Sequence, residues 1–384
     1  MKKKIAILGS TGSIGTTSLN IIKKKKNLFD VQLLSANKNY KNICQQIVKF
    51  KPKYFVVTNN FIFLKIKKRF KNKKTKILNS YDNLSLSKKV DITIVSIPGI
   101  AGLKPTISLI RKSKKILLAN KESIICGWQI INSLAKKYKT KIVPIDSEHF
   151  SIMKLLENHK KDEIEKIYIT ASGGPFLNLP INKFKTIKPK DAIKHPKWSM
   201  GKKISVDSST LMNKILELME ALKMFPFKLE KYHIIIHPQS LVHAIVKLKN
   251  GITKLLYHEP DMTIPISNAI FDSNVEINNY IKKKSKIKNL EFFEPNHKKF
   301  PALKLIPKLN KYISTPIIIN AANEILVDHF LKKKISFTSI FRYLFLVLKD
   351  KNYRKYAIQK PNKLKVIYTI DNWARNKVED LLKA

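Results

Sequence analysis

A short apolar strand that runs directly into a glycine-rich turn limits the fold of this chain more than any other feature. Ile5–Leu8 is followed by Gly9, Gly12 and Gly15 and then by a helical stretch. Glycines here permit a sharp turn, let backbone amides approach a pyrophosphate at the helix N-terminus, and let helix and strand pack closely. Because the pattern lies at the first strand–helix junction, it predicts a dinucleotide-binding unit.

Further apolar segments follow at helix-length intervals, as in a doubly wound, Rossmann-like parallel sheet. The strands expected from them are residues 31–36, 54–58, 91–97, 115–118 and 141–145. The second strand ends at Asn37, Lys38 and Asn39, where an NAD enzyme carries an acidic residue for the ribose 2′-hydroxyl. A cation and two amides suit a 2′-phosphate instead, so the sequence favours NADPH over NADH.

Two carboxylates stand close together after the last of these strands. If Lys141–Ile145 is a strand, Asp146 and Glu148 point the same way, and their repulsion calls for a cation. A divalent metal with oxygen ligands meets that need, whereas an isolated motif of this kind is more often a solvated turn. The segment Ala119–Ser123 also follows a strand; its Asn-Lys-Glu suits either a helix cap or a ligand site.

The middle of the chain offers three further candidates. Ser172 beside two glycines forms either an anion-binding nest or a plain turn. The segment Lys194–Lys203 is predicted to be a lid over substrate, since it places Trp198 in a loop. The alternative is a loop that only packs against the rest of the protein. Residues 205–210 are expected to cap a helix from Leu211 to Lys223.

That helix is apolar nearly all round, yet it keeps three polar residues together. Asn213, Lys214 and Glu217 fall on one face. Asn213 and Lys214 are suited to phosphate or hydroxyl groups, and Glu217 to a metal. A simple Lys214–Glu217 ion pair is the alternative.

Composition restricts the class of protein. The 384 residues carry 75 Lys and Arg against 27 Asp and Glu, a formal charge of +48, which would suit nucleic-acid binding if it were clustered. The lysines are instead spread along the whole chain, so a lysine-biased composition is favoured and no nucleic-acid partner is expected. Two cysteines without a CxxC pattern, no signal peptide and no apolar run of about 20 residues indicate a cytoplasmic protein without a membrane anchor.

The last third of the chain predicts a lysine-rich linker and then a small helical bundle. The linker is expected at 272–297, with one short strand near Leu290–Phe293. Helical stripes follow, and the last helix is expected to open near Asp371. Asn320 and Glu324 either brace the site from behind or form interhelical bonds.

Taken in order, the motifs resemble the 1-deoxy-D-xylulose 5-phosphate reductoisomerase family over essentially the whole chain. They are G-S-T-G-S-I-G, L-A-N-K-E-S, P-I-D-S-E-H, A-S-G-G-P-F, H-P-K-W-S-M-G-K-K-I-S-V-D-S, L-M-N-K-I-L-E, H-P-Q-S-L-V-H, E-P-D-M and N-A-A-N-E. The resemblance implies rearrangement and NADPH-dependent reduction of 1-deoxy-D-xylulose 5-phosphate to 2-C-methyl-D-erythritol 4-phosphate, with Mg²⁺ or Mn²⁺ as the metal and Co²⁺ as an alternative. It also implies a homodimer built mainly through the middle domain.

The resemblance assigns roles residue by residue. The implied metal ligands are Asp146, Glu148 and Glu217. Lys121, Asp146, Glu148, His195 and Glu217 are implied in catalysis. Substrate contacts are implied for Lys121, Ser147, Glu148, Ser172, His195, Trp198, Ser208, Asn213, Lys214 and Glu217. The NADPH site is implied to be lined by Thr11, Gly12, Ser13, Ile14, Asn37, Lys38, Asn39, Asn120, Glu122 and Gly201.

The expected domains are an NADPH-binding domain at 1–146, an α/β catalytic and dimerisation domain at 147–271 with a flap at 194–203, the linker at 272–297, and a helical domain at 298–384. The chain departs from the family pattern at Asn37, Phe150 and Leu177, none of which is a proposed metal ligand. A dehydrogenase acting on an acyl phosphate or semialdehyde is less favoured, because it needs a nucleophilic cysteine in the second domain, and Cys44 and Cys126 both lie in the first.

Overall fold

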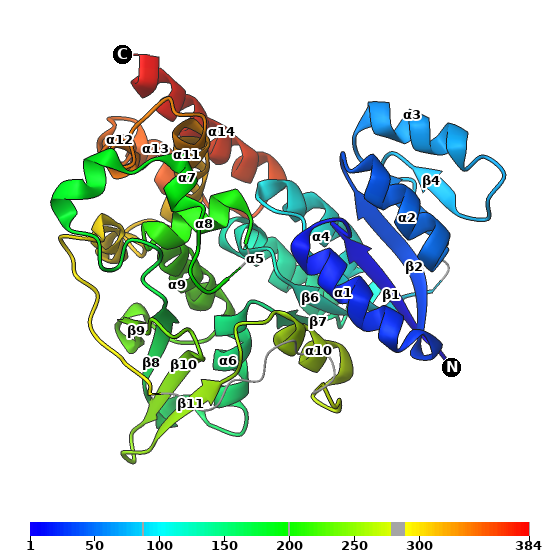
Figure 1. The fold of residues 1–384 in the computed structure, drawn as a ribbon, viewed down its shortest axis with the longest axis horizontal. Coiled ribbons are helices and arrows are strands. Elements are labelled where there is room, and N and C mark those ends of the chain that lie inside the picture. Colours follow the sequence, from blue (N-terminus) through cyan, green and yellow to red (C-terminus); the bar gives the residue numbers. More distant parts are fainter. Residues whose placement is uncertain (87, 199, 278–288, 384) are drawn as a thin grey trace. The chain divides into compact units, whose positions relative to one another are not determined.

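The chain divides into two compact units in the computed structural model, which describes all residues except 87, 199, 278–288 and 384 (Figure 1). Unit 1 comprises Met1–Ser123, Gln129–Phe150 and Met262–Lys282, and unit 2 comprises Ile124–Trp128, Ser151–Asp261 and Lys283–Ala384. The predicted flap and linker therefore include residues outside the described ones, Ser199 in the flap and 278–288 in the linker. The domain limits expected from the sequence stay a prediction.

Unit 1 is built on a seven-stranded sheet with the order β4-β3-β2-β1-β5-β6-β7, in which all neighbours are parallel. The strands are β1 (Lys3–Leu8), β2 (Phe29–Ala36), β3 (Tyr54–Val57), β4 (Lys76–Leu78), β5 (Val90–Val95), β6 (Ser113–Leu118) and β7 (Lys141–Pro144). The strand order reverses between β1 and β5, and doubly wound sheets bind ligands at such a reversal. The predicted parallel sheet is confirmed, and β4 is the strand that the sequence did not reveal.

Helices fill the connections of unit 1, and α10 returns late in the chain to pack against α1 and β6. The helices are α1 (Ser13–Lys24), α2 (Tyr40–Phe50), α3 (Asn60–Arg69), α4 (Leu103–Ile110) and α10 (Thr263–Phe271), while α5 (Lys121–Lys137) and α6 (Ser147–Leu156) have residues in both units. Side-chain caps fix where α2 and α3 begin, because Asn39 accepts from the amide of Asn42 and Asn59 from that of Ile62.

Unit 2 contains a four-stranded mixed sheet with the order β11-β10-β8-β9. Its strands are β8 (Ile164–Ala171), β9 (Tyr232–Ile236), β10 (Val242–Leu248) and β11 (Thr253–Tyr257). β8 and β9 are parallel, whereas β10 runs antiparallel to both β8 and β11. The expected strand near Leu290–Phe293 is reduced to a single bridge between Phe293 and Ile236.

Helices complete unit 2, and α11 is the one that organises the C-terminal bundle, packing against α8, α12 and α14. The helices are α7 (Pro189–Ala192), α8 (Lys202–Ser209), α9 (Met212–Met224), α11 (Thr315–Leu331), α12 (Ser339–Lys349), α13 (Tyr353–Ala357) and α14 (Leu364–Lys383). Short 3₁₀ helices lie at Lys26–Leu28, Ile100–Gly102, Lys161–Glu163, Ile181–Thr186, Leu229–Lys231 and Pro301–Lys308. The predicted fold class is thus confirmed, with a parallel-sheet unit, a second α/β region and a helical bundle.

Two helix boundaries differ from the sequence expectation. Residues 205–209 belong to α8 and do not cap the following helix, which starts after Leu211 in the left-handed region at φ 63°. Of the expected capping segment, Thr210 does contact the helix start, because its hydroxyl accepts from the amide of Met212 at 3.4 Å. The last helix opens at Leu364 instead of near Asp371, with its buried stripe already begun at Ile367. Among the described residues, no helix combines the length and apolarity needed to cross a membrane.

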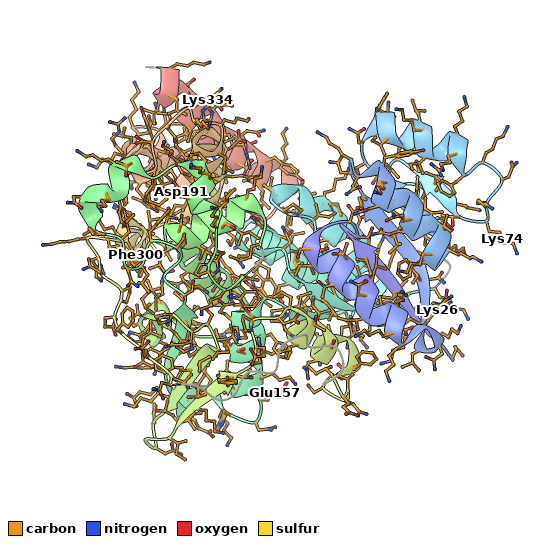
Figure 2. The ribbon with its side chains drawn as sticks, viewed as in Figure 1. Lys26, Lys74, Glu157, Asp191, Phe300 and Lys334 are labelled. Carbon is orange, nitrogen blue, oxygen red and sulfur yellow. The ribbon has the colours of Figure 1, made fainter. Side chains whose placement is uncertain are left out.

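The positive charge is spread over the surface. Figure 2 shows lysine side chains pointing outward from many elements, including Lys26 and Lys74 in unit 1 and Lys334 in unit 2. Such a distribution fits the interpretation of the +48 charge as compositional.

We predict that Gly15→Ala destabilises the fold by about 1–3 kcal/mol, because a Cβ at this position would lie 2.4 Å from the carbonyl oxygen of Gly9 and 2.6 Å from Cα of Ser10. Gly12→Ala is the matched control. Its Cβ would come no closer than 3.4 Å to that same oxygen, so it should lose less than about 1 kcal/mol. Denaturant unfolding measures both, and equal losses would contradict the close approach of helix and turn.

Candidate active site

The glycine-rich turn after β1 leaves room for a ligand at the start of α1. Gly9 has φ +81°, and a Cβ there would lie 2.7 Å from the carbonyl oxygen of Ser96, so the loops after β1 and β5 touch at the strand-order reversal. Thr11 and Ile14 are half-buried, while Gly12 and Ser13 are exposed at the helix N-terminus. Exposed amides at a helix start attract anionic groups, as a pyrophosphate requires.

The segment after β2 is exposed, but one of its three side chains already caps a helix. Asn37, Lys38 and Asn39 are all exposed to solvent. The side-chain oxygen of Asn39 accepts from the amide of Asn42 at 3.1 Å and so caps α2. Lys38 carries the charge of this segment and lies on its exposed side.

Asn120 is a buried helix cap. Its oxygen accepts from the amide of Ser123 at 2.7 Å, and its amide group donates to the carbonyl of Ile97 at 2.7 Å and to Glu122 at 3.0 Å. Of the two interpretations that the Asn-Lys-Glu motif allowed, the cap is present. It ties the start of α5 to the loop after β5, which fixes the place of the next residue, Lys121.

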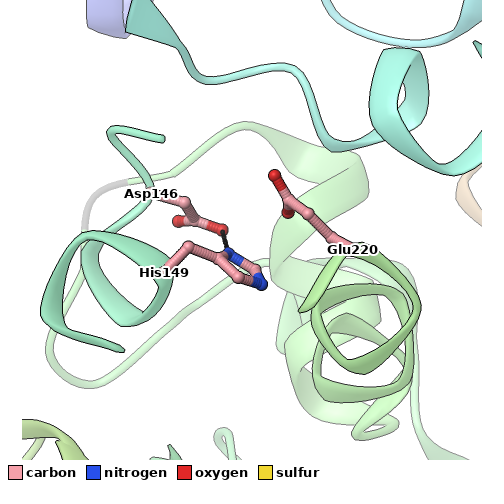
Figure 3. A group of neighbouring side chains, drawn as sticks. All are labelled: Asp146, His149 and Glu220. Carbon is pink, nitrogen blue, oxygen red and sulfur yellow. Dashed lines mark ion pairs between the residues drawn. The ribbon is translucent and has the colours of Figure 1, made fainter. Parts of the chain in front are cut away.

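Lys121 and Asp146 form an ion pair at the carboxyl ends of β6 and β7. Both side chains are largely buried, with exposed fractions of 13% and 17%. His149, which is fully buried, turns its Nδ1 toward the same carboxylate at 3.7 Å (Figure 3). Burial alone would raise the pKa of Asp146, but Lys121 and His149 outweigh it and hold this pKa far below its usual range.

Glu148 reaches the same region by a different route from the one expected. β7 ends at Pro144 and Ser147 begins α6, so Asp146 lies in the turn and Glu148 in the first helical turn. Strand alternation therefore does not relate the two carboxylates. The hydroxyl of the buried Ser147 donates to Glu148 at 2.6 Å, and its amide donates to Asp146 at 3.2 Å.

In unit 2, the loop after β8 meets the end of α8. Gly173 and Gly174 both have positive φ, a conformation that favours glycine, and a Cβ on Gly174 would lie 2.8 Å from the carbonyl oxygen of Ser208. The hydroxyl of Ser172 accepts from the amide of Gly174 at 3.1 Å. The two segments that carry Ser172 and Ser208 are thereby held side by side.

His195 joins this cluster through its Nε2, which lies 2.9 Å from the hydroxyl of Ser172. Its Nδ1 accepts the backbone amides of Lys197 at 3.2 Å and Trp198 at 3.0 Å. A nitrogen that accepts two N–H groups carries no proton, so the neutral ring donates from Nε2. Burial and then the charge of Lys214 lower the pKa of His195 from 6.5 to about 4.

The three polar residues of α9 lie together, as the sequence predicts. Both Asn213 and Lys214 donate to the carboxylate of Glu217, the lysine at 2.6 Å. Lys214 is 6% exposed and Glu217 1%. The Lys214–Glu217 ion pair, which the sequence left as an alternative, is therefore formed. Because Lys214 also lies close enough to His195 to lower its pKa, the pair does not exclude a binding role for the same residues. Glu220, one turn further on, is also buried and projects from α9 in Figure 3.

Asp207 is a residue whose role the sequence did not reveal. It is 1% exposed, accepts from the amide of Asn323 on α11 at 2.8 Å and pairs with Lys203 at 2.8 Å. The Lys203–Asp207 spacing of four residues is the sequence signal that could have indicated this pair. The contact anchors α8, and with it Ser208, against the C-terminal bundle.

The predicted flap connects α7 to α8. Trp198 is half-buried and sets its ring edge against His243 with centroids 6.0 Å apart. Gly201 is exposed and is the residue from which α8 starts. Trp198 is therefore held by a ring contact and is not part of the buried core.

We predict that NMR titration of His195 gives a midpoint well below 6.5 and near 4, because the fold disfavours its charged form. Since the folded pKa lies below the unfolded one, His195 costs no stability above about pH 6.5 and destabilises the fold as pH falls toward 4. A His195→Gln variant assigns the resonance by its absence. A midpoint at or above 6.5 would contradict the arrangement.

Comparisons with known proteins cover nearly the whole chain. Models of the 1-deoxy-D-xylulose 5-phosphate reductoisomerase family match residues 5–127, and those of its C-terminal domains match 142–225 and 258–377.

A reductoisomerase of Pelagibacter ubique is 45% identical over 99% of both chains, and one of Wolbachia pipientis from Culex pipiens is 38% identical over 100% of this chain and 98% of its own. A solved DOX-P reductoisomerase in complex with NADPH, fosmidomycin and magnesium has a TM-score of 0.93 at 31% identity, covering 99% of this chain and 98% of that one. The Zymomonas mobilis enzyme in complex with NADPH has a TM-score of 0.89 at 32% identity over the full length of both. The chain thus belongs to the 1-deoxy-D-xylulose 5-phosphate reductoisomerase family.

Proposed function

We propose that this chain catalyses the NADPH- and divalent-metal-dependent rearrangement and reduction of 1-deoxy-D-xylulose 5-phosphate to 2-C-methyl-D-erythritol 4-phosphate in non-mevalonate isoprenoid synthesis. The observation that carries the proposal is family membership along the whole chain, with polar clusters at the motif positions that the chemistry needs. Solved relatives bind NADPH and magnesium, which supports the same cofactors here.

The cofactor requirements fit the residues of unit 1. The loops after β1 and β5 approach closely because Gly9 has no side chain, and α1 approaches the turn after β1 because Gly15 has none. This arrangement places backbone amides at the start of α1 where a pyrophosphate can bind. Exposed Lys38 offers a charge to a 2′-phosphate. We assign Thr11–Ile14, Asn37–Asn39, Asn120 and Glu122 of unit 1 and Gly201 of unit 2 to this site, with Asn120 acting through the loop that it holds.

The proposed metal ligands are three carboxylates, Asp146 and Glu148 from unit 1 and Glu217 from unit 2. Oxygen donors of this kind suit Mg²⁺, Mn²⁺ or Co²⁺. Lys121 keeps Asp146 ionised despite its burial, which preserves a ligand ready to bind a cation. When bound, the metal supplies Lewis acidity to a ketone and its neighbouring hydroxyl, and NADPH supplies the reducing hydride.

The proposed substrate phosphate site lies in unit 2. Ser172, Ser208, Asn213 and Lys214 provide hydroxyl, amide and ammonium donors, the set that a phosphate accepts. Neutral His195 adds a hydrogen-bonding group without adding charge. Phosphate binding would draw Lys214 from Glu217 and leave that carboxylate for a metal.

The remaining roles are those of positioning and exclusion of water. Lys121 orients Asp146, and Ser147 orients Glu148 through its 2.6 Å hydrogen bond. We propose that the flap at 194–203, which carries Trp198, covers the substrate and excludes water during the reaction.

We also propose that the chain works as a homodimer in the cytosol. The dimer rests on the family resemblance, in which the middle region makes the two-fold contact. The compartment is supported by Cys44 and Cys126, which are buried thiols, as expected where cysteines stay reduced.

The proposed function is tested by following NADPH absorbance with purified protein, 1-deoxy-D-xylulose 5-phosphate and Mn²⁺. Consumption of NADPH should require both the substrate and the metal. Consumption that continues unchanged after removal of the metal with a chelator would contradict the metal dependence.

We predict that Glu217→Gln raises the half-saturating Mn²⁺ concentration at least about tenfold and greatly lowers kcat, because the substitution removes one anionic ligand. The fold should survive, since size and helix propensity are kept. A metal titration of activity measures the effect.

Lys214→Gln is the contrasting variant, because it removes the other partner of the same ion pair. It should raise KM for the phosphorylated substrate and leave the half-saturating metal concentration near that of the parent. If Glu217→Gln changes only KM as Lys214→Gln does, Glu217 is an ion-pair partner and not a ligand.

We predict that kcat/KM is at least about tenfold higher with NADPH than with NADH, roughly 1.4 kcal/mol, because Lys38 meets a 2′-phosphate and no carboxylate meets a 2′-hydroxyl. Lys38→Ala should narrow the ratio by raising KM for NADPH alone. Equal kcat/KM values for the two cofactors in the parent would refute this assignment.

A further inference from the structure

Two histidines of unit 2 stack against each other beside the predicted flap. His243 lies in β10 and His258 directly follows β11. Their ring centroids are 3.7 Å apart and the planes differ by 14°. Both side chains are buried, with exposed fractions of 2% and 8%. A stack this close and this well covered holds both ring planes in place.

The backbone explains why His243 points toward this stack. Val242 pairs with Tyr257 and Ala244 with Leu256, so two steps along β10 match one step along β11. His243 is therefore the extra residue of a β-bulge, a feature that turns a side chain out of the regular alternation.

Hydrogen bonds to backbone carbonyl groups hold the two rings in place. Nε2 of His243 lies 3.1 Å from the carbonyl oxygen of His258, and Nδ1 of His258 lies 2.7 Å from that of Glu259. The amide of His258 also donates to the carbonyl of Leu241 at 2.9 Å. Hydrogen bonds at the end of β11 thus fix the ring of His258, which can then support the ring of His243.

His243 also contacts the flap. The ring of Trp198 approaches it edge-on, with centroids 6.0 Å apart and planes at 74°. His243 therefore contacts the rings of both Trp198 and His258. Trp198 is only half-buried, and this ring contact connects it to the sheet.

We propose that His258 is a positioning residue that holds His243 in the orientation that receives Trp198, and so sets how firmly the flap covers the substrate. The inference deepens the proposed function and rests on it for the effect on substrate. The docking of Trp198 itself depends only on the described contacts within unit 2.

The direct test uses tryptophan fluorescence in the absence of substrate. Trp128 and Trp373 are replaced by Phe in the full-length chain so that Trp198 alone reports. His258→Ala should increase acrylamide quenching of Trp198 at least about twofold, because loss of the stack releases His243. His258→Phe keeps a ring at this position and should give quenching close to that of the parent.

The second readout is steady-state kinetics with the same variants. His258→Ala should raise KM for substrate by about three- to tenfold, the range expected for one aromatic pair, and change kcat less, whereas His258→Phe should restore KM. His233→Ala is the matched control, since this half-buried histidine on β9 pairs with Tyr168 and should leave both readouts unchanged.

Quenching that stays the same in His258→Ala, or His258→Phe that behaves as His258→Ala does, would overturn the inference. Increased quenching with an unchanged KM would overturn its link to substrate. If the parent does not turn over the substrate, the proposed function fails, while the quenching comparison still tests the stack.

Discussion

The ion pair between Lys121 and Asp146 is the interaction on which the rest of the site depends. Burial of a carboxylate costs free energy unless a positive charge lies nearby, and without such a charge the carboxylate takes up a proton. Here the lysine starts the helix after β6 and the aspartate follows β7, so neighbouring parallel strands bring the two charges together at one edge of the sheet. An ionised carboxylate is thereby kept in a protected place, which is the state that a metal ligand needs.

The same rule governs unit 2. Glu217 is paired with Lys214 and Asn213, and Asp207 with Lys203 and Asn323. Although lysines are frequent in this chain, Lys214 is buried beside Glu217, and Lys203 is partly covered beside the buried Asp207. These pairs lower the cost of burying the two carboxylates within unit 2.

Much of this could be predicted from the sequence because it rests on local patterns. The apolar runs gave the strands of the parallel sheet, and the glycines at 9, 12 and 15 marked the turn that the structure contains. The grouping of Asn213, Lys214 and Glu217 followed from helical spacing alone.

Other features depend on contacts between distant segments. The β-bulge at His243 is defined by its pairing with β11, and the Asp207–Asn323 bond joins residues 116 positions apart. Most of the expected capping segment 205–210 instead belongs to α8, which packs against the distant α11.

The central claim is that the chain both rearranges the carbon skeleton and reduces it, and carbon NMR of the product tests this most directly. Purified protein is given ¹³C-labelled 1-deoxy-D-xylulose 5-phosphate with NADPH and Mn²⁺. The expected product is branched, and its methyl-bearing carbon has a new carbon–carbon bond, as in 2-C-methyl-D-erythritol 4-phosphate. A straight-chain polyol phosphate, formed by reduction of the ketone without rearrangement, would contradict it.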